Sequence, residues 1–228
     1  MFFYEMHQHT NRCSLCGRVE VKELIKALAE QGVDGVVFTN HFRYGNTAID
    51  RTLPFEDFCK EYIEDYQIGK EEAKKYGIDV FFGLEEHVGN AKEVLIYGLT
   101  PKGLLRHPDF YSGNLEKIYK AAHKENALVI QAHPFRERDY IPDPDLKLPP
   151  EFLDGYEVFN RGNTDEMNDK ALKYAENSGK IIVAGSDSHD TDNGYYRFGI
   201  KCEKRIKDEK DLADILRNGE YIISNTRE

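Results

Sequence analysis

The sequence predicts an α/β fold built from repeated strand–helix units, in one domain over residues 1–228. Two observations lead to this prediction. Short apolar runs alternate with longer stretches whose apolar residues recur at helical spacing. The chain is also long enough for one sizeable core, and it contains no linker, tandem repeat or low-complexity segment. Such units imply a parallel sheet with helices outside it, either open or closed into a barrel.

The expected strands are short apolar runs, most of which are separated by helical stretches. They fall at 2–6, 35–39, 80–83, 94–98, 127–131, 156–159, 181–185 and 221–224. Helical spacing is clearest where Val21, Leu24, Ile25 and Leu28 share one face and Gly32 ends the helix. The same spacing predicts helices within 58–77, 114–126, 165–178 and 212–216.

Composition argues against several classes of protein. Hydrophobic residues make up 40% of the chain and charged residues 32%, which is typical of a soluble globular protein. No apolar run is long enough to span a membrane, and no signal peptide is visible, so we expect a cytoplasmic protein with no membrane partner. The net charge is −10 and no basic stripe is visible, so we find no strong sign of nucleic-acid binding.

Imidazole and carboxylate side chains follow five of the seven expected strands that precede the last one. Because the carboxyl ends of parallel strands converge on one face of a barrel, we expect these side chains to form one site. Residues two apart in a strand point to the same side, so His7 and His9 can reach one ion together. The motifs are HQH at 7–9, TNH at 39–41, GLE at 83–85, AHP at 132–134 and GSDSH at 185–189.

This set holds too many ligands for one tetrahedral zinc site, which takes about four. It predicts two or three divalent ions that share a bridging carboxylate. Mixed imidazole and carboxylate donors fit Zn, Mn or Fe, and they make a site for Mg or Ca alone unfavourable. Neighbouring ions lower the pKa of a bound water and neutralise charge during an in-line displacement, as phosphate-ester hydrolysis requires. The candidate ligands are His7, His9, His41, Glu85, His133, Asp187 and His189.

Three further residues are candidates for the same site. Arg136 and Arg161 follow strand ends, and a guanidinium fork suits the oxygens of a phosphate, although each also fits a surface ion pair. Glu157 lies among apolar strand residues, where an unpaired charge is costly. We therefore expect Glu157 to accept a hydrogen bond from a metal-bound histidine rather than to be a solvated charge.

These five motifs, in this order, resemble those of the polymerase and histidinol phosphatase (PHP) family of metal-dependent phosphoesterases. The resemblance runs from about residue 4 to about residue 200. It implies a distorted seven-stranded (βα) TIM-like barrel with up to three metals. It also implies that His7, His9 and Asp187 bind the first ion, His133 the second, and His41 with His189 the third, while Glu85 bridges two of them.

The sequence departs from the family pattern at several places. An acid or histidine often follows the first motif, but Leu15 cannot bind a metal, so a third site needs Cys13 or Cys16 as a substitute. The simpler interpretation of these cysteines is two semi-buried thiols in a loop. Asn40 replaces an acid of the second motif, and we expect it to support a ligand rather than to bind the ion.

The second site also differs from the family pattern. Many family members have a histidine just before the fourth strand, where this chain has Glu93. A carboxylate at this position would favour a harder ion such as Mn. His87, two residues after Glu85, is the rival candidate for the same role.

The sequence thus predicts an enzyme that hydrolyses a phosphomonoester or a small phosphodiester with a metal-bound hydroxide, on a small phosphorylated substrate. His189 or a metal-bound water would protonate the leaving group. One alternative is an amidohydrolase-type metal hydrolase, but that family normally has a bridging lysine derivative where this chain has Glu85. Another is a catalytically degenerate, metal-stabilised PHP module, which the lost ligand at Leu15 favours.

Overall fold

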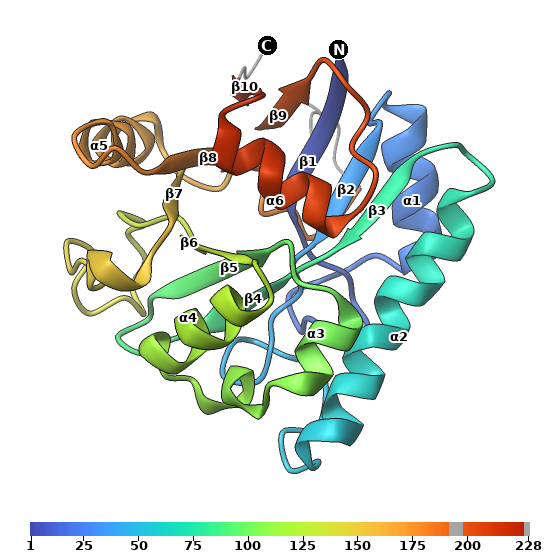
Figure 1. Cartoon of the computed structure of the whole chain (residues 1–228), viewed down its shortest axis with the longest axis horizontal. Helices are drawn as coiled ribbons and strands as arrows, with labels where there is room; N and C mark the ends of the chain where they lie inside the picture. The colour runs from blue at the N-terminus through green and yellow to red at the C-terminus, as the bar shows by residue number, and fades with distance from the viewer. Residues whose placement is uncertain (192–197, 226–228) are drawn as a thin grey trace.

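The computed structural model describes residues 1–191 and 198–225. Two five-stranded mixed sheets form its framework, with helices packed around them (Figure 1). The first sheet has the order β10-β9-β1-β2-β3 and the second has the order β4-β5-β6-β7-β8. The strands are β1 (Phe2–Gln8), β2 (Gly35–Phe38), β3 (Asp79–Phe82), β4 (Leu84–His87), β5 (Glu93–Tyr97), β6 (Leu128–Gln131), β7 (Gly155–Asn160), β8 (Ile181–Gly185), β9 (Phe198–Cys202) and β10 (Ile222–Asn225).

The prediction of a seven-stranded TIM-like barrel is wrong, because neither sheet closes. A short turn after His87, with positive φ at Gly89, Asn90 and Ala91, folds β5 back antiparallel to β4. Strand β5 is antiparallel to β6 as well, so the parallel order is interrupted in the middle of the chain. Strand β9, which the apolar pattern did not predict, lies between β1 and β10 and pairs antiparallel with both, so the first sheet is mixed as well.

The predicted helices are present, with boundaries close to those expected. Helix α1 buries Val21, Leu24, Ile25 and Leu28 against the core, as their spacing predicted. The two helices α4 and α5 begin at Asn114 and Thr164 caps, whose side chains accept hydrogen bonds from the backbone three residues on. The helices are α1 (Val21–Glu30), α2 (Phe55–Ala73), α3 (Pro101–Arg106), α4 (Leu115–Lys124), α5 (Asp165–Glu176) and α6 (Glu209–Asn218), with short 3-10 turns at Pro108–Ser112 and Pro150–Phe152.

The two sheets meet at the carboxyl ends of β1, β2 and β8. Single parallel bridges join Gln8 to Ser188 and His41 to Glu85, but neither bridge extends into a ladder. Polar side chains from both sheets are therefore brought together at this junction. Among the described residues, no helix has the length and apolar character needed to cross a bilayer.

Candidate metal centre

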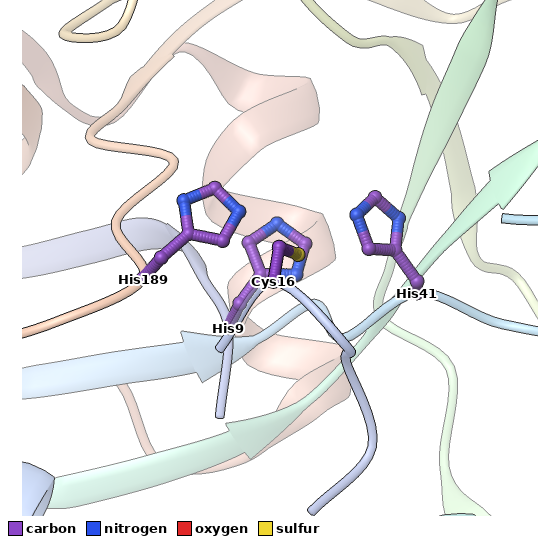
Figure 2. Close-up of side chains that lie close together, drawn as sticks. All are labelled: His9, Cys16, His41 and His189. Atoms are coloured by element: carbon purple, nitrogen blue, oxygen red, sulfur yellow. The ribbon is translucent and has the colours of Figure 1, made fainter. Parts of the chain in front are cut away.

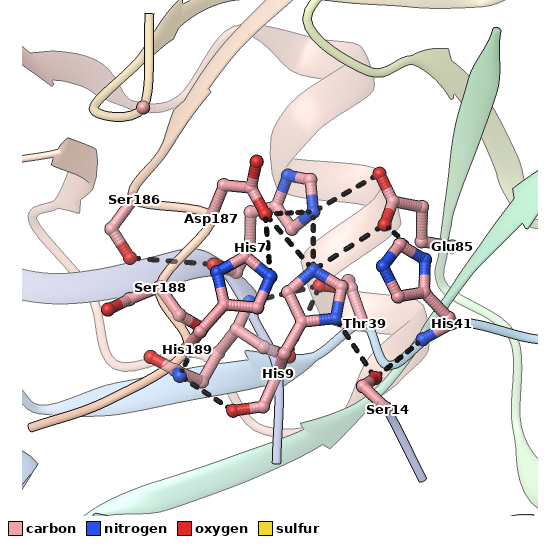
Figure 3. A network of polar contacts seen from close by, with 12 residues as sticks. His7, His9, Ser14, Thr39, His41, Glu85, Ser186, Asp187, Ser188 and His189 are labelled. Carbon is pink, nitrogen blue, oxygen red and sulfur yellow. Dashed lines mark hydrogen bonds and ion pairs between the residues drawn. The ribbon is translucent and has the colours of Figure 1, made fainter. Parts of the chain in front are cut away.

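The seven ligands that the motifs predicted lie close together at this junction of the sheets (Figure 2, Figure 3). His7 lies in β1 and Glu85 in β4, and the others follow the ends of β1, β2, β6 and β8. Most of these side chains are buried, whereas His189 keeps 31% of its side chain exposed. The fold therefore gathers residues more than 180 positions apart in the chain, although it is not the predicted barrel.

Ring nitrogens and carboxylate oxygens converge at the centre of the group. His7 Nε2 and His9 Nε2 are 3.1 Å apart, and His9 Nε2 is 3.1 Å from Asp187 Oδ1. His133 Nε2 lies 3.1 Å from Glu85 Oε1, which is itself 3.4 Å from His7 Nε2. We call these five residues the inner cluster. Two imidazole nitrogens that face each other across a carboxylate are the arrangement expected around a cation.

Glu85 lies between the inner cluster and two further ligand candidates. Its Oε2 atom is 3.0 Å from His41 Nδ1, which in turn lies 3.5 Å from Glu93 Oε1. Glu93 Oε2 is 3.6 Å from His133 Nε2. The structure thus brings Glu93 into a donor cluster, whereas its rival His87 lines the neighbouring cavity and belongs to no such cluster in the described part of the chain.

Four residues form a third group of donors, which we call the thiol cluster. Figure 2 shows His9, Cys16, His41 and His189 side by side, and one ligand atom of each lies within 4.8 Å of the others. Burial acts to raise the pKa of the Cys16 thiol, but hydrogen bonds from His189 and His41 outweigh it and lower the pKa to about 7. Cys13 is fully buried and belongs to no donor group within the residues described.

Hydrogen bonds behind the ligands orient the imidazole rings. His7 Nδ1 is 2.9 Å from Glu157 Oε1, and His9 Nδ1 is 3.1 Å from Ser14 Oγ. When each Nδ1–H donates to these oxygens, each Nε2 presents its lone pair to the centre. Ser14 Oγ donates in turn to Asn40 Oδ1 at 3.0 Å. Glu157 and Asn40 thus lie where the sequence expected supporting residues.

Arg136 contacts a ligand candidate rather than pointing freely into the cavity. Its Nη2 atom is 2.6 Å from Asp187 Oδ2 and donates to Asn160 at 2.7 Å, and its Nε donates to Asn163 at 3.0 Å. Burial alone would raise the pKa of Asp187, but the Arg136 guanidinium and His7 lower it well below its usual range. Arg161 lines an adjoining cavity of about 480 Å³ instead.

Two ligand candidates have unusual backbone geometry. His133 has a φ of 28° and Asp187 has a φ of 54°, in the left-handed region that non-glycine residues rarely adopt. His133 is held there by its N–H, which donates to Glu157 Oε2 at 2.9 Å. Strain of this kind persists only where the surroundings enforce it, and it concentrates at functional sites.

The charges and unpaired atoms of the site fit divalent cations. Glu85 Oε2 and His41 Nδ1 are buried and lie 3.0 Å apart, and beyond this contact neither atom has a hydrogen-bond partner. Burial and the nearby Glu85 carboxylate raise the pKa of Glu93. Burial and then His41 lower the pKa of His9 to about 3, which keeps this ring neutral and able to bind a metal. A bound cation would pair the orphaned atoms and relieve the repulsion between carboxylates.

A cavity of about 620 Å³ opens above the ligands, within the range of small-molecule sites. Its wall includes Tyr44, Arg138 and Tyr140, which the sequence analysis did not identify, besides Arg136 and His189. Tyr44 lies in the loop 42–54, and Arg138 and Tyr140 lie in the loop 136–152, where no motif singles out an individual side chain.

The donor set and the cavity above it define an α/β protein with side-chain clusters that are able to bind metal ions. A model of the PHP domain matches residues 5–214, so the chain belongs to the PHP domain family. No curated protein sequence matches the chain significantly. The predicted family resemblance is therefore confirmed, and with it a family of metal-dependent phosphoesterases.

Several solved structures share the fold. A two-domain protein from Bacteroides vulgatus, which contains a predicted PHP-like metal-dependent phosphoesterase, is 18% identical, with 100% of this chain and 60% of that chain covered and a TM-score of 0.58. An amidohydrolase from Chromobacterium violaceum, with bound sulfate and no metal, is 13% identical over 96% and 97% of the chains, with a TM-score of 0.61. The lesion-specific endonuclease PfuEndoQ from Pyrococcus furiosus is 12% identical over 97% and 57%, with a TM-score of 0.59.

The last of these corrects one prediction from composition. Endonuclease Q has been solved with a 27-mer duplex that carries an abasic lesion at its active site. Our prediction that the chain shows no strong sign of nucleic-acid binding is therefore wrong as an exclusion. A net charge of −10 is summed over the whole surface, whereas binding depends on the local field near the cavity, where Arg136 and Arg138 lie.

Proposed function

We propose that this protein is a hydrolase that cleaves phosphomonoesters or phosphodiesters at the metal centre. The observation that carries this proposal is the convergence of three imidazoles and two carboxylates of the inner cluster beneath a cavity of about 620 Å³. Metal ions in such a site supply an activated water and neutralise charge on the phosphoryl oxygens. This combination is the one that phosphate-ester hydrolysis requires.

The side chains themselves would hold the ions and keep the rings in a single orientation. We assign His7, His9 and Asp187 to one ion, His133 and Glu93 to a second, and Glu85 to the position between them. This assignment is supported by the position of Glu85 between the two sets of ligands, since its Oε1 atom lies 3.4 Å from His7 Nε2 and 3.1 Å from His133 Nε2.

Arg136 has a positioning role in this proposal. Because two of its nitrogens are engaged with Asp187, Asn160 and Asn163, its main effect is to keep Asp187 ionised and aimed at the centre. Its charge also lies at the cavity wall, where it attracts a phosphate. Arg161, in the adjoining cavity, is proposed to contact a more distant part of the substrate.

His189 is available for either of two roles. Its Nε2 atom lies 3.8 Å from Asp187 Oδ1 at the cavity wall, where the ring could donate a proton to the leaving-group oxygen of the substrate. It also belongs to the thiol cluster, where it could bind an ion instead. Amidohydrolase chemistry is not favoured, because Glu85 takes the bridging place between the ligand groups.

The test is turnover by metal-supplemented protein on 4-nitrophenyl phosphate, on bis(4-nitrophenyl) phosphate and on a DNA duplex with an abasic site. We expect activity on at least one of these esters that depends on added Zn or Mn. Glu85→Gln should lower it by about 100-fold or more, since loss of even a supporting residue costs 10–100-fold. Glu176→Gln, an exposed carboxylate on α5, is the control and should leave the rate unchanged. Absence of turnover on all three substrates, with metal bound, would refute the proposal.

A further inference from the structure

Cys16 stands out among the donors because it is the single thiol in a group of imidazoles. The segment between β1 and α1 carries it, and backbone hydrogen bonds hold it on both sides. Leu15 N donates to Asn46 O at 2.9 Å, and Arg18 N donates to His189 O at 2.7 Å. The second of these bonds ties the cysteine loop directly to the loop that carries His189. The proximity of thiol and imidazole thus follows from the backbone.

The packing of this loop leaves little freedom for its conformation. A Cβ atom at Gly17 would lie 2.3 Å from the backbone of Thr10, so the chain makes a close approach that only glycine permits. Ser14, which lies two residues before Cys16, is fixed by its contacts with His9 and Asn40. Cys16 is therefore placed beside the imidazoles by the same loop that orients His9.

We propose that Cys16, together with His41 and His189, forms a thiolate–imidazole cation site that selects zinc. The site adjoins the inner cluster and shares the cavity with it. In this assignment His189 binds an ion rather than donating a proton. The proposal deepens the proposed function. It rests on that function in one respect, because it assumes that the neighbouring ions are bound.

The nature of the donors carries the selectivity. A thiolate with two or three imidazoles is a zinc donor set, because sulfur and imidazole nitrogen are softer ligands than carboxylate oxygen. The neighbouring position, which we assign to His133, Glu93 and Glu85, is richer in oxygen and suits a harder ion such as Mn. Two adjacent positions of one centre would therefore prefer different metals.

The geometry favours an open site rather than a closed structural one. Cys16, His41 and His189 all line the cavity of about 620 Å³, so an ion held by them would face the substrate space. Structural zinc sites are closed by four protein ligands, whereas catalytic sites keep one position free. An ion at this place could bind a phosphoryl oxygen directly.

The other cysteine of the CxxC does not share this environment. Cys13 Sγ donates to the carbonyl of Tyr62 at 3.9 Å and has no exposed surface. The sequence analysis favoured two semi-buried thiols in a loop, whereas Cys13 is fully buried. The pair is thus split, with one thiol in the core and one at the metal centre.

Cobalt substitution tests the proposal without any measurement of turnover. Thiolate bound to Co²⁺ gives a charge-transfer absorption band in the near ultraviolet, which imidazole and carboxylate ligands do not give. We expect this band in the Co²⁺-loaded wild-type protein and not in Cys16→Ser. Cys202→Ala, in which a buried thiol of β9 outside the cluster is removed, should keep the band.

Metal affinity gives a second measurement of the same site. Cys16→Ser should weaken zinc binding at one position by about 100-fold or more. Cys16→Asp should restore the number of bound ions but shift the preference of that position from Zn towards Mn, because a harder donor has replaced the thiolate. Folding of both variants is checked by thermal unfolding in the presence of a chelator.

A wild-type spectrum without the thiolate band, or a band that survives in Cys16→Ser, would overturn the proposal. In the wild-type protein, zinc should also protect Cys16 from alkylation by iodoacetamide, as mapped by mass spectrometry, while magnesium should not. Equal alkylation with and without zinc would count against it too. A thiolate band without any phosphoesterase turnover would refute only the proposed function, and turnover without the band would refute only this site.

Discussion

Glu157 offers the sharpest test of how the protein prepares its imidazole ligands. Its Oε1 atom is 2.9 Å from His7 Nδ1, and its Oε2 atom accepts hydrogen bonds from His133 N at 2.9 Å and Asn160 Nδ2 at 3.0 Å. The side chain is 1% exposed, so water cannot replace these contacts. One carboxylate thus fixes the ring of one ligand and the strained backbone of another.

Glu157→Gln keeps the shape but replaces one acceptor with an NH₂ donor. If the NH₂ faces His7, the Nδ1 atom must accept its hydrogen bond. The neutral ring then carries its proton on Nε2, the atom that would bind the ion. If it faces His133, a buried backbone N–H loses its acceptor. A hydrogen bond to a charged group contributes about 1.5–3 kcal/mol, which corresponds to about 10–150-fold in binding. We therefore expect zinc affinity at the inner cluster to fall by about that factor.

The assay is competition for zinc between the protein and a chromophoric chelator of known affinity. Glu176→Gln removes an exposed carboxylate on the surface of α5 and serves as the control for the change of net charge. Thermal unfolding in chelator establishes that both variants fold. An affinity of folded Glu157→Gln within about threefold of wild type would show that the hydrogen bond to His7 does not prepare the ligand.

Two further predictions concern buried charges near the centre. Burial raises the pKa of Asp65 to about 6 from 3.8, despite hydrogen bonds from Thr10 and Asn40. Between about pH 4 and 6 only the unfolded chain releases this proton, so the free energy of unfolding should fall by about 3 kcal/mol as pH rises. Chemical denaturation of Asp65→Asn across this pH range should show no such fall. An unchanged dependence of the unfolding free energy on pH in this variant would contradict the prediction. Arg136→Met leaves the buried Asp187 carboxylate without its guanidinium, so metal-free protein should lose about 3 kcal/mol of stability, and zinc should raise the melting temperature more than in wild type. Equal zinc-induced shifts would refute this second expectation.

Local spacing was sufficient to predict that several of the candidate ligands lie close together. Because side chains alternate along a strand, residues two apart such as His7 and His9 point to the same side. This alternation can be applied to the sequence without knowing which segments pack against the strand. The positions of Glu85, His133 and Asp187 after apolar runs predicted that they would meet where strands end. These predictions depend on short-range geometry, which each segment carries by itself.

The overall architecture depended on contacts that spacing does not encode. The turn after His87 reverses the chain and makes β4 and β5 a hairpin, so the second sheet is mixed instead of parallel. An apolar run has the same pattern whether its neighbour is parallel or antiparallel. Strand direction is decided by the turn and by the packing of the sheets, so the sequence pattern alone left it open.

The final arrangement of the ligands was likewise decided by tertiary structure. The sequence by itself determined which kinds of donor were available, and it identified Glu93 and His87, or Cys13 and Cys16, only as rival candidates. Packing brings Glu93 and Cys16 to the centre, sends Cys13 into the core and turns Arg136 towards Asp187. The physical reason is that a side chain's partners come from segments far away in the chain, and their positions are fixed only when the two sheets pack together.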